Sequence, residues 1–324
     1  MAHHPAIEVV TDRITRDIIG GAVDTAKEVM TAMGEVANTS EASTVVELFK
    51  EMDQAATAVL KICPSFAPPI NVLHMMLGTV ERDLAAGSSV TEAKKHLTET
   101  QSQFFTLIET ALTKIANIGA ELIKDGYTIF MFSMSSSVWK VLKRAKEQGK
   151  HFTVLVTEAR PGNEGLWTVD EMNKSGIPVE VSIDACIAEL IARSNIVFAG
   201  VDSVAADGSV FNKAGSYLCA LVAREFGVPF YFVTDTLKFD MATLLGLPFR
   251  SDPVQYEDVL GERKFVGPVK VVGKLFDTTP ANLITALITE LGPIHPSACV
   301  NVMWNMKSSQ RISEQIPAWA YGTL

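Results

Sequence analysis

Four polar side chains in the C-terminal half of the chain have the types and spacing of a ligand site. They are Asp202, Asn212, Lys213 and Lys238. Asp202 follows the apolar run 196–199, and Lys238 follows the apolar run 229–233. If these runs are parallel strands, the four side chains lie near the carboxyl edge of a sheet, where open α/β folds bind ligands. A carboxylate, an amide and two ammonium groups there suit a phosphorylated sugar or a nucleotide better than an apolar ligand.

A second candidate site is a serine-rich segment that follows the apolar run 127–132. Its serines are Ser133, Ser135, Ser136 and Ser137. Hydroxyls and free backbone N–H groups at the start of a helix can bind an anion. The same segment can instead cap the helix predicted over 138–147, for which a single serine suffices. No GxGxxG sequence follows the run, and the four cysteines lack zinc-type spacing, so neither a cofactor nor a metal ion is expected.

Composition narrows the possible partners. The chain has 324 residues, of which 48% are apolar, and a net charge of −9. This length supports one large or two ordinary domains, and the acidic balance argues against nucleic acid as a partner. No apolar run reaches the length of a membrane span, and the N-terminus lacks the pattern of a secretory signal. Four scattered cysteines indicate free thiols, so we expect a cytoplasmic protein that does not bind membranes.

The elements that must position these residues change character near residue 124. Before it, apolar residues recur at helical spacing in about four segments, which favours a helical domain over 1–123 used for packing and oligomer formation. After it, short apolar runs alternate with helices, which predicts an α/β domain with a parallel sheet over 124–324. The predicted strands are 127–132, 152–157, 179–183, 196–199 and 230–233. The predicted helices are 138–147, 166–174, 185–193, 216–226 and 280–291. The stretch between Gly200 and Gly215 is predicted as a loop.

Several motifs occur in the order found in a known family. They are Val156–Pro161 with Gly165, Asp184-Ala185, Gly200–Val204, Gly208–Gly215, Lys238-Phe239, Leu275–Pro280 and Glu290–Gly292. In this order they resemble the family that joins the α, β and δ subunits of translation initiation factor 2B to two sugar-phosphate isomerases. Those isomerases act on ribose 1,5-bisphosphate and on methylthioribose 1-phosphate. The resemblance covers roughly Asp12 to Pro296.

The resemblance implies a helical N-terminal domain, a Rossmann-like C-terminal domain and a homodimer or higher homo-oligomer. In the isomerases of the family, a cysteine after the first strand and an aspartate after the fourth move a proton between C1 and C2 of the sugar. The aspartate matches Asp202. The ligand-binding positions match Ser135, Arg160, Asn212, Lys213 and Lys238.

The chain departs from the family at several site positions. The cysteine position is Ser133, and a hydroxyl is a much weaker acid than a thiol. An often basic position is Ser136, and two arginine positions are Ile19 and Ala67. Loss of two guanidinium groups removes bidentate phosphate contacts, so we do not expect a bisphosphate to be held in the family's way.

Three functions therefore stay open. The first is an aldose–ketose isomerase-like enzyme that acts on a phosphorylated sugar, with Asp202 as the general acid/base. The second is a regulatory protein that binds a sugar phosphate or nucleotide without turnover, which Ser133 favours. The third is a subunit of a translation-factor complex.

Each site residue also has a purely structural interpretation. Asp202 can cap a turn, since aspartate is common in turns. Lys213 and Lys238 can be solvated surface lysines. Arg160 can brace its loop through Glu158 instead of contacting a ligand.

Overall fold

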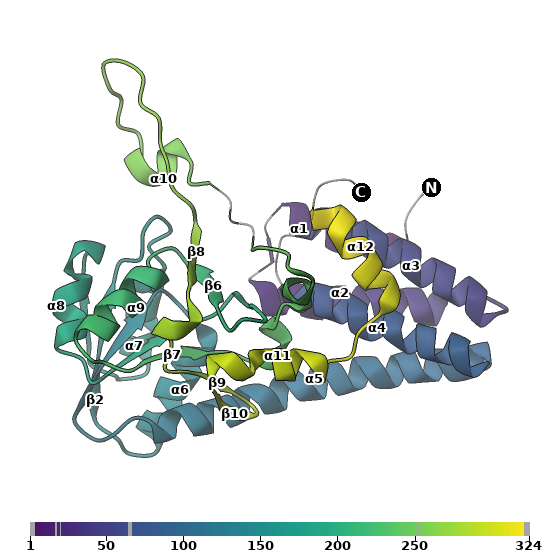
Figure 1. Cartoon of the computed structure of the whole chain (residues 1–324), viewed down its shortest axis with the longest axis horizontal. Helices are drawn as coiled ribbons and strands as arrows, with labels where there is room; N and C mark the ends of the chain where they lie inside the picture. Colours follow the sequence, from purple (N-terminus) through teal and green to yellow (C-terminus); the bar gives the residue numbers. More distant parts are fainter. Residues whose placement is uncertain are drawn as a thin grey trace. The chain divides into compact units, whose positions relative to one another are not determined.

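The computed structural model describes residues 4–16, 18–19, 21–63, 67–249, 251 and 253–320, with the side chains of 317–320 excepted. Two compact units divide the chain (Figure 1). The helical unit comprises residues 1–109, 237–248 and 301–324, and the sheet unit comprises residues 110–236 and 249–300. Each unit thus gathers more than one stretch of chain, and the predicted domain boundary at residue 123 stays a prediction.

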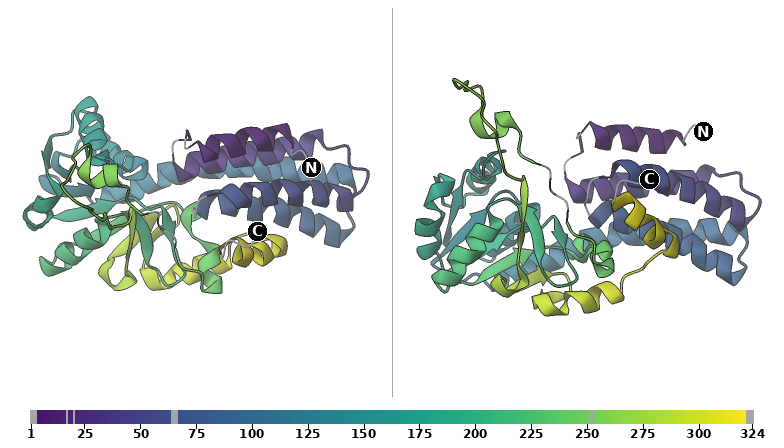
Figure 2. Two further views of the ribbon diagram at one scale, coloured as in Figure 1. Left: turned by 90° about the horizontal axis from the view of Figure 1, so that it is seen from above. Right: turned by 45° about the horizontal axis from the view of Figure 1, so that its top comes forward.

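The helical unit is built from amphipathic helices with buried apolar faces. They are α1 (Pro5–Thr15), α2 (Ala22–Thr39), α3 (Val45–Ile62), α4 (Ala67–Ala86) and the first part of α5 (Val90–Glu121). The apolar positions from Ile14 to Met33 recur at helical spacing, but they are divided between α1 and α2. Gly21 before α2 has a φ of 100°, which a continuing helix cannot accommodate. The two views in Figure 2 show α1–α4 from further sides.

Helix α4 forms the centre of this unit and holds the later segments of the chain. Most of its residues are buried. The Asn71 amide donates hydrogen bonds to the carbonyls of Leu237 and Phe239, at 2.6 and 2.9 Å. Glu81 accepts hydrogen bonds from the Ser309 hydroxyl and the Arg311 N–H, at 2.8 and 2.9 Å. These bonds attach the segment that contains η3 (Met241–Leu245) and the C-terminal helix α12 (Gln310–Ala320) to α4.

The sheet unit contains a seven-stranded sheet in the order β10-β9-β7-β4-β1-β2-β3. The strands are β1 (Tyr127–Phe132), β2 (Phe152–Thr157), β3 (Val179–Ser182), β4 (Ile196–Ala199), β7 (Phe230–Val233), β9 (Ala286–Thr289) and β10 (Gly292–Ile294). All neighbours pair in parallel except β9 and β10. The α/β fold class is confirmed, as are the five predicted strands, with β3 ending one residue earlier than expected.

The helices that follow the strands are α6 (Ser136–Glu147), α7 (Glu164–Lys174), α8 (Ile187–Ala192) and α9 (Ser216–Glu225). They confirm the predicted helices to within a few residues at each end. The predicted helix over 280–291 is wrong: this stretch forms the short turn η4 (Ala281–Leu283) and strand β9. Its apolar residues fill a buried strand instead, and a short apolar run does not distinguish a strand from a buried helix.

The predicted loop between Gly200 and Gly215 is also wrong in part. It contains β5 (Ser203–Val204) and β6 (Val210–Lys213), which pair antiparallel, and β6 pairs antiparallel with β8 (Phe276–Thr279). The connecting Gly208 has a φ of 83°, and the Asp207 carboxylate accepts a hydrogen bond from the Ser209 N–H at 2.8 Å. An Asp-Gly pair between apolar residues is a hairpin signal.

The strand order creates a topological switch point between β1 and β4. From β1 the chain continues to β2 and β3 on one side, and it then returns to β4 on the other side. The crevice at the carboxyl ends of two such strands is the usual ligand site of open α/β sheets. Among the described residues, no helix has both the length and the apolar character needed to cross a membrane.

Candidate functional site

The loop after β1 holds Ser133 in a backbone conformation that L residues rarely adopt. Its φ is 60°, and the residue is 6% exposed. Thr168 Oγ1 of α7 donates a hydrogen bond to the Ser133 carbonyl at 3.0 Å. Such left-handed non-glycine residues concentrate at functional sites, so this loop is a candidate ligand contact.

Ser135 caps α6 and contacts the loop that follows β4. Its Oγ accepts a hydrogen bond from the Val138 N–H at 3.3 Å. A Cβ added to Gly200 would lie 2.7 Å from the Ser135 Cβ, so the loops after β1 and β4 are in direct contact. Ser136 is exposed and Ser137 is buried. Their backbone N–H groups lie in the first turn of α6, where an anion is favoured.

Replacing Gly200 by alanine is expected to displace Ser135, because the new methyl group would need the space of the Ser135 side chain. Crowding and loss of the α6 cap should together lower the free energy of unfolding by about 1–3 kcal/mol, which chemical denaturation measures. The double variant with Ser135→Gly removes the crowding and should recover most of the stability. Equal stability of Gly200→Ala and the parent would contradict this close contact.

Asp202 follows β4, on the other side of the switch point from Ser133. Its backbone N–H donates a hydrogen bond to the Phe211 carbonyl of β6 at 3.0 Å, so the β5–β6 hairpin fixes its position. The residue is half-buried. Because β1 and β4 are neighbours, Asp202 and Ser133 follow adjacent strands at the same edge of the sheet. A carboxylate in this place can exchange a proton with a ligand in the crevice.

Lys213 ends β6 and forms an ion pair with a residue that the sequence did not indicate. Its Nζ lies 2.6 Å from Glu164 Oε1, and the two side chains are 11% and 23% exposed. Lys213 is therefore not a solvated surface lysine. Glu164 is the first residue of α7, where the helix dipole favours a carboxylate. No local pattern in the sequence indicates the ion pair, because its two residues lie 49 positions apart.

One face of α7 connects the parts of the site. Glu164 and Thr168 are four residues apart, so they lie on the same face of the helix. Glu164 pairs with Lys213, and Thr168 holds the Ser133 carbonyl. The structure thereby brings Ser133 and Lys213 to the same helix face, and the β5–β6 hairpin links Lys213 to Asp202.

Asn212 has its own hydrogen-bond partner on the other face of β6. Side chains alternate along a strand, so Asn212 points away from the face of Lys213. Its amide donates to Ser216 Oγ at 2.8 Å, and that hydroxyl donates to the Lys213 carbonyl at 2.7 Å. These bonds brace the turn into α9. The predicted ligand contact of Asn212 stays a prediction.

Arg160 braces a loop, but its partners differ from the expected Glu158. The Asp184 carboxylate accepts its backbone N–H at 2.8 Å. Its guanidinium donates to the Asp258 carbonyl of α10 (Tyr256–Leu260) at 2.8 Å. Arg160 is exposed, and its predicted ligand contact stays a prediction.

Lys238 belongs to the helical unit, at the end of the turn η2 (Thr236–Lys238). Its part in the ligand site stays a prediction.

Within the sheet unit, Glu290 forms hydrogen bonds with Thr236, the first residue of η2. The Glu290 carboxylate accepts the Thr236 N–H at 3.1 Å and also the Thr236 hydroxyl. Burial raises the pKa of Glu290.

Comparison with known proteins decides the family. The model of the initiation factor 2 subunit family matches residues 19–296. The chain belongs to the initiation factor 2 subunit family. It is 32% identical over 266 residues to the ribose 1,5-bisphosphate isomerase of Archaeoglobus fulgidus, with 82% of this chain and 83% of that protein covered.

Other relatives of this family member carry the names of translation initiation factors. A Pyrococcus horikoshii protein named as translation initiation factor eIF-2B subunit 2-like is 33% identical over 282 residues, with 87% of this chain and 93% of that protein covered. The solved structure of translation initiation factor eIF-2B from P. horikoshii OT3 has a TM-score of 0.73 at 30% identity, and the match covers 92% of this chain and 99% of that one. The resemblance inferred from the motifs is therefore confirmed.

Three of the four cysteines of this family member, Cys63, Cys219 and Cys299, are buried. Burial raises the pKa of Cys63 and of Cys299 to about 12, and it raises that of Cys219 well above its usual value. Such thiols are poor nucleophiles and poor proton donors. Among the described residues, no group of three or more His, Cys, Asp or Glu side chains is placed to hold a metal ion.

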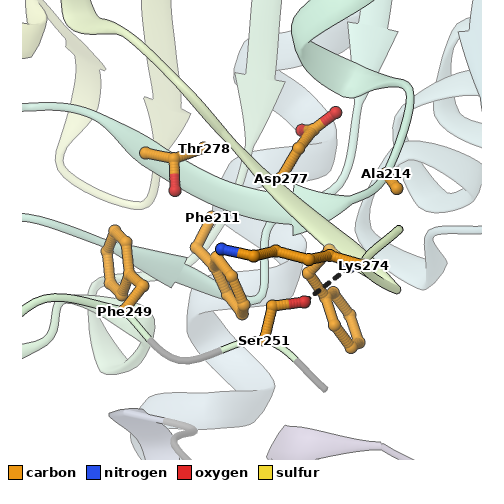
Figure 3. Close-up of a pocket in the computed structure, with 8 residues that line it drawn as sticks. Phe211, Ala214, Phe249, Ser251, Lys274, Asp277 and Thr278 are labelled. Atoms are coloured by element: carbon orange, nitrogen blue, oxygen red, sulfur yellow. Dashed lines mark hydrogen bonds between the residues drawn. The ribbon is translucent and has the colours of Figure 1, made fainter. Parts of the chain in front are cut away.

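A separate pocket of about 420 Å³ lies against β6 and β8, and Figure 3 shows its lining side chains. Phe211 stacks between Phe249 and Phe276, with ring centroids 5.1 and 5.2 Å apart. Asp277 accepts the Gly215 N–H at 2.7 Å and so caps α9; burial raises its pKa to about 6. None of the predicted site residues lines this pocket.

Proposed function

We propose that the crevice between β1 and β4 binds a phosphorylated sugar and that Asp202 exchanges a proton with it in an aldose–ketose isomerisation. The observation that carries this proposal is the convergence of Ser133, Asp202 and Lys213 at the switch point through α7 and the β5–β6 hairpin. The relative named ribose 1,5-bisphosphate isomerase supports the reaction class.

The expected chemistry follows from the groups at the crevice. The phosphate binds at the start of α6, where the N–H groups of Ser136 and Ser137 and nearby hydroxyls act as donors. The Asp202 carboxylate removes the proton from C2 and returns it to C1, while the hydroxyl proton on O2 moves to O1. Ser133 occupies the position of the family's thiol. Because a serine hydroxyl is a weaker acid, we expect slower turnover than with a cysteine.

A second candidate function is binding without turnover, as in a regulatory protein. Ser133 in place of cysteine favours binding without turnover. Ile19 and Ala67, which stand where the resemblance predicts arginines, favour it as well. Homo-oligomer formation and a cytoplasmic location also stay predictions.

Ligand affinity is expected to depend on Lys213. A thermal-shift screen over pentose phosphates, hexose phosphates and nucleotides identifies the ligand, and calorimetric titration then measures its affinity. Lys213→Ala alone would leave the Glu164 carboxylate without its counter-ion, so the comparison is made in a Glu164→Gln background. In that background Lys213→Ala should weaken binding about tenfold or more, since hydrogen bonds to charged groups contribute ~1.5–3 kcal/mol. Lys238→Ala should act in the same direction.

The matched control is Lys174→Ala, which removes an exposed lysine at the end of α7 and should leave affinity unchanged. Unchanged affinity in both the Lys213 and the Lys238 variants would contradict the proposed site.

A further inference from the structure

Glu164 has one carboxylate oxygen whose bonding is incomplete. Oε1 is paired with Lys213 at 2.6 Å. Oε2 is buried, and no donor among the described residues reaches it. Leaving a buried acceptor of a charged group unsatisfied is costly, and such exceptions in native proteins call for an explanation. A hydrogen-bond donor supplied by a ligand would satisfy this oxygen.

Close packing of the backbone fixes the place of Glu164. A Cβ on Gly165 would lie 1.7 Å from the Thr157 carbonyl oxygen, so the first turn of α7 sits directly on the end of β2. The Gly165 N–H also donates to the Glu158 carbonyl at 3.2 Å. A Cβ on Gly162 would lie 2.4 Å from Glu164 Oε1, so the preceding loop passes over the carboxylate. The first turn of α7 is therefore fixed against β2, and the Glu164 carboxylate lies close to the Gly162 backbone.

The ion pair changes what Lys213 can recognise. An unpaired lysine at a sheet edge attracts phosphate, whereas Glu164 neutralises this ammonium and repels a second anion. A hydroxyl group fits the pair: it can donate to Oε2 and accept one of the three N–H groups of the ammonium.

We propose that Glu164 is a specificity-determining residue that selects a sugar with a free hydroxyl, instead of a second phosphate, at the Lys213 end of the site. This inference rests on the proposed function. The ligand class is then a sugar monophosphate, with its phosphate at the start of α6 and with a hydroxyl that donates to Glu164 Oε2 and accepts from the Lys213 ammonium.

The test compares ribose 5-phosphate with ribose 1,5-bisphosphate by calorimetric titration at fixed pH and salt. The parent should bind the monophosphate at least tenfold more tightly than the bisphosphate. Glu164→Gln keeps the shape and removes the charge, so it should reduce this preference at least tenfold by strengthening bisphosphate binding. Gly162→Ala, which pushes the carboxylate away from Lys213, should act in the same direction. Glu171→Gln, the same change at another glutamate of α7, should leave the preference unchanged.

An unchanged preference in Glu164→Gln would overturn the inference, as would a parent that prefers the bisphosphate. If the parent binds no sugar phosphate in the thermal-shift screen, the proposed function fails, and inorganic phosphate then decides the role of Glu164. Phosphate binding at least tenfold tighter in Glu164→Gln than in the parent supports the repulsion of anions by Glu164, and equal binding overturns it.

Discussion

Asp202→Asn is expected to lower the isomerisation rate by about 10²- to 10⁴-fold, the usual contribution of a general acid/base. The amide keeps the shape of the side chain but cannot exchange a proton in the same way. Ligand affinity should change little, because the backbone N–H of Asp202 still donates to the Phe211 carbonyl. Steady-state kinetics should therefore show a loss in kcat with KM largely retained.

Asp207→Asn is the matched control, since Asp207 lies in the turn of the same hairpin and is exposed. It should retain full activity. Ser133→Cys should raise the rate, because it restores a more acidic group at the family's cysteine position. A rate in Asp202→Asn equal to that of the parent would exclude Asp202 as the general acid/base.

Gly165→Ala is expected to have the largest effect on stability. The new Cβ would lie 1.7 Å from the Thr157 carbonyl oxygen. The obstacle is backbone, so α7 must move away from β2. We expect the free energy of unfolding to fall by about 3 kcal/mol or more. Denaturant unfolding measures this loss, and ligand binding should weaken with it because α7 carries Glu164 and Thr168.

Gly162→Ala is the control for this substitution. Its nearest atoms belong to the flexible end of the Glu164 side chain, which can move aside. It should cost less than Gly165→Ala, because moving one side chain away from Lys213 requires less rearrangement than moving α7 away from β2. If the two variants unfold at the same denaturant concentration, α7 is not packed against β2 as described.

The central strands of the sheet could be predicted because their burial leaves a plain signal in the sequence. Strands β1, β2, β4 and β7 are covered on both faces, so they appear as continuous apolar runs bounded by polar turns. The helices between these strands could be predicted equally well, since each helix begins soon after a strand ends. Element ends differed by a few residues, as is usual when caps and frayed turns decide them.

The elements that were wrong depend on contacts between distant residues. Strand β9 pairs with β7, more than fifty residues earlier, and its run of apolar and β-branched residues fits a helix or a strand equally well. Strand β6 reaches its second partner, β8, across more than sixty residues. The Asp207-Gly208 turn is the local signal of the hairpin, but two short strands of two and four residues do not stand out from a loop in the sequence.

The residues of the candidate site could be predicted from the sequence, but the contacts between them could not. Asp202 and Ser133 could be placed from the strands that they follow, because the carboxyl ends of parallel strands share one edge. The pairing of Lys213 with Glu164 could not be predicted, since it joins the end of β6 to the start of α7. That pairing changes Lys213 from a free phosphate ligand into half of a neutral pair.

The most direct test of the account is proton exchange at C2 of a bound sugar phosphate in deuterated water, followed by nuclear magnetic resonance. The account predicts that the parent incorporates deuterium at C2 and that Asp202→Asn loses this exchange while still binding the ligand. Absence of exchange by the parent on every sugar phosphate that it binds would contradict a proton-transferring site and would support binding without turnover.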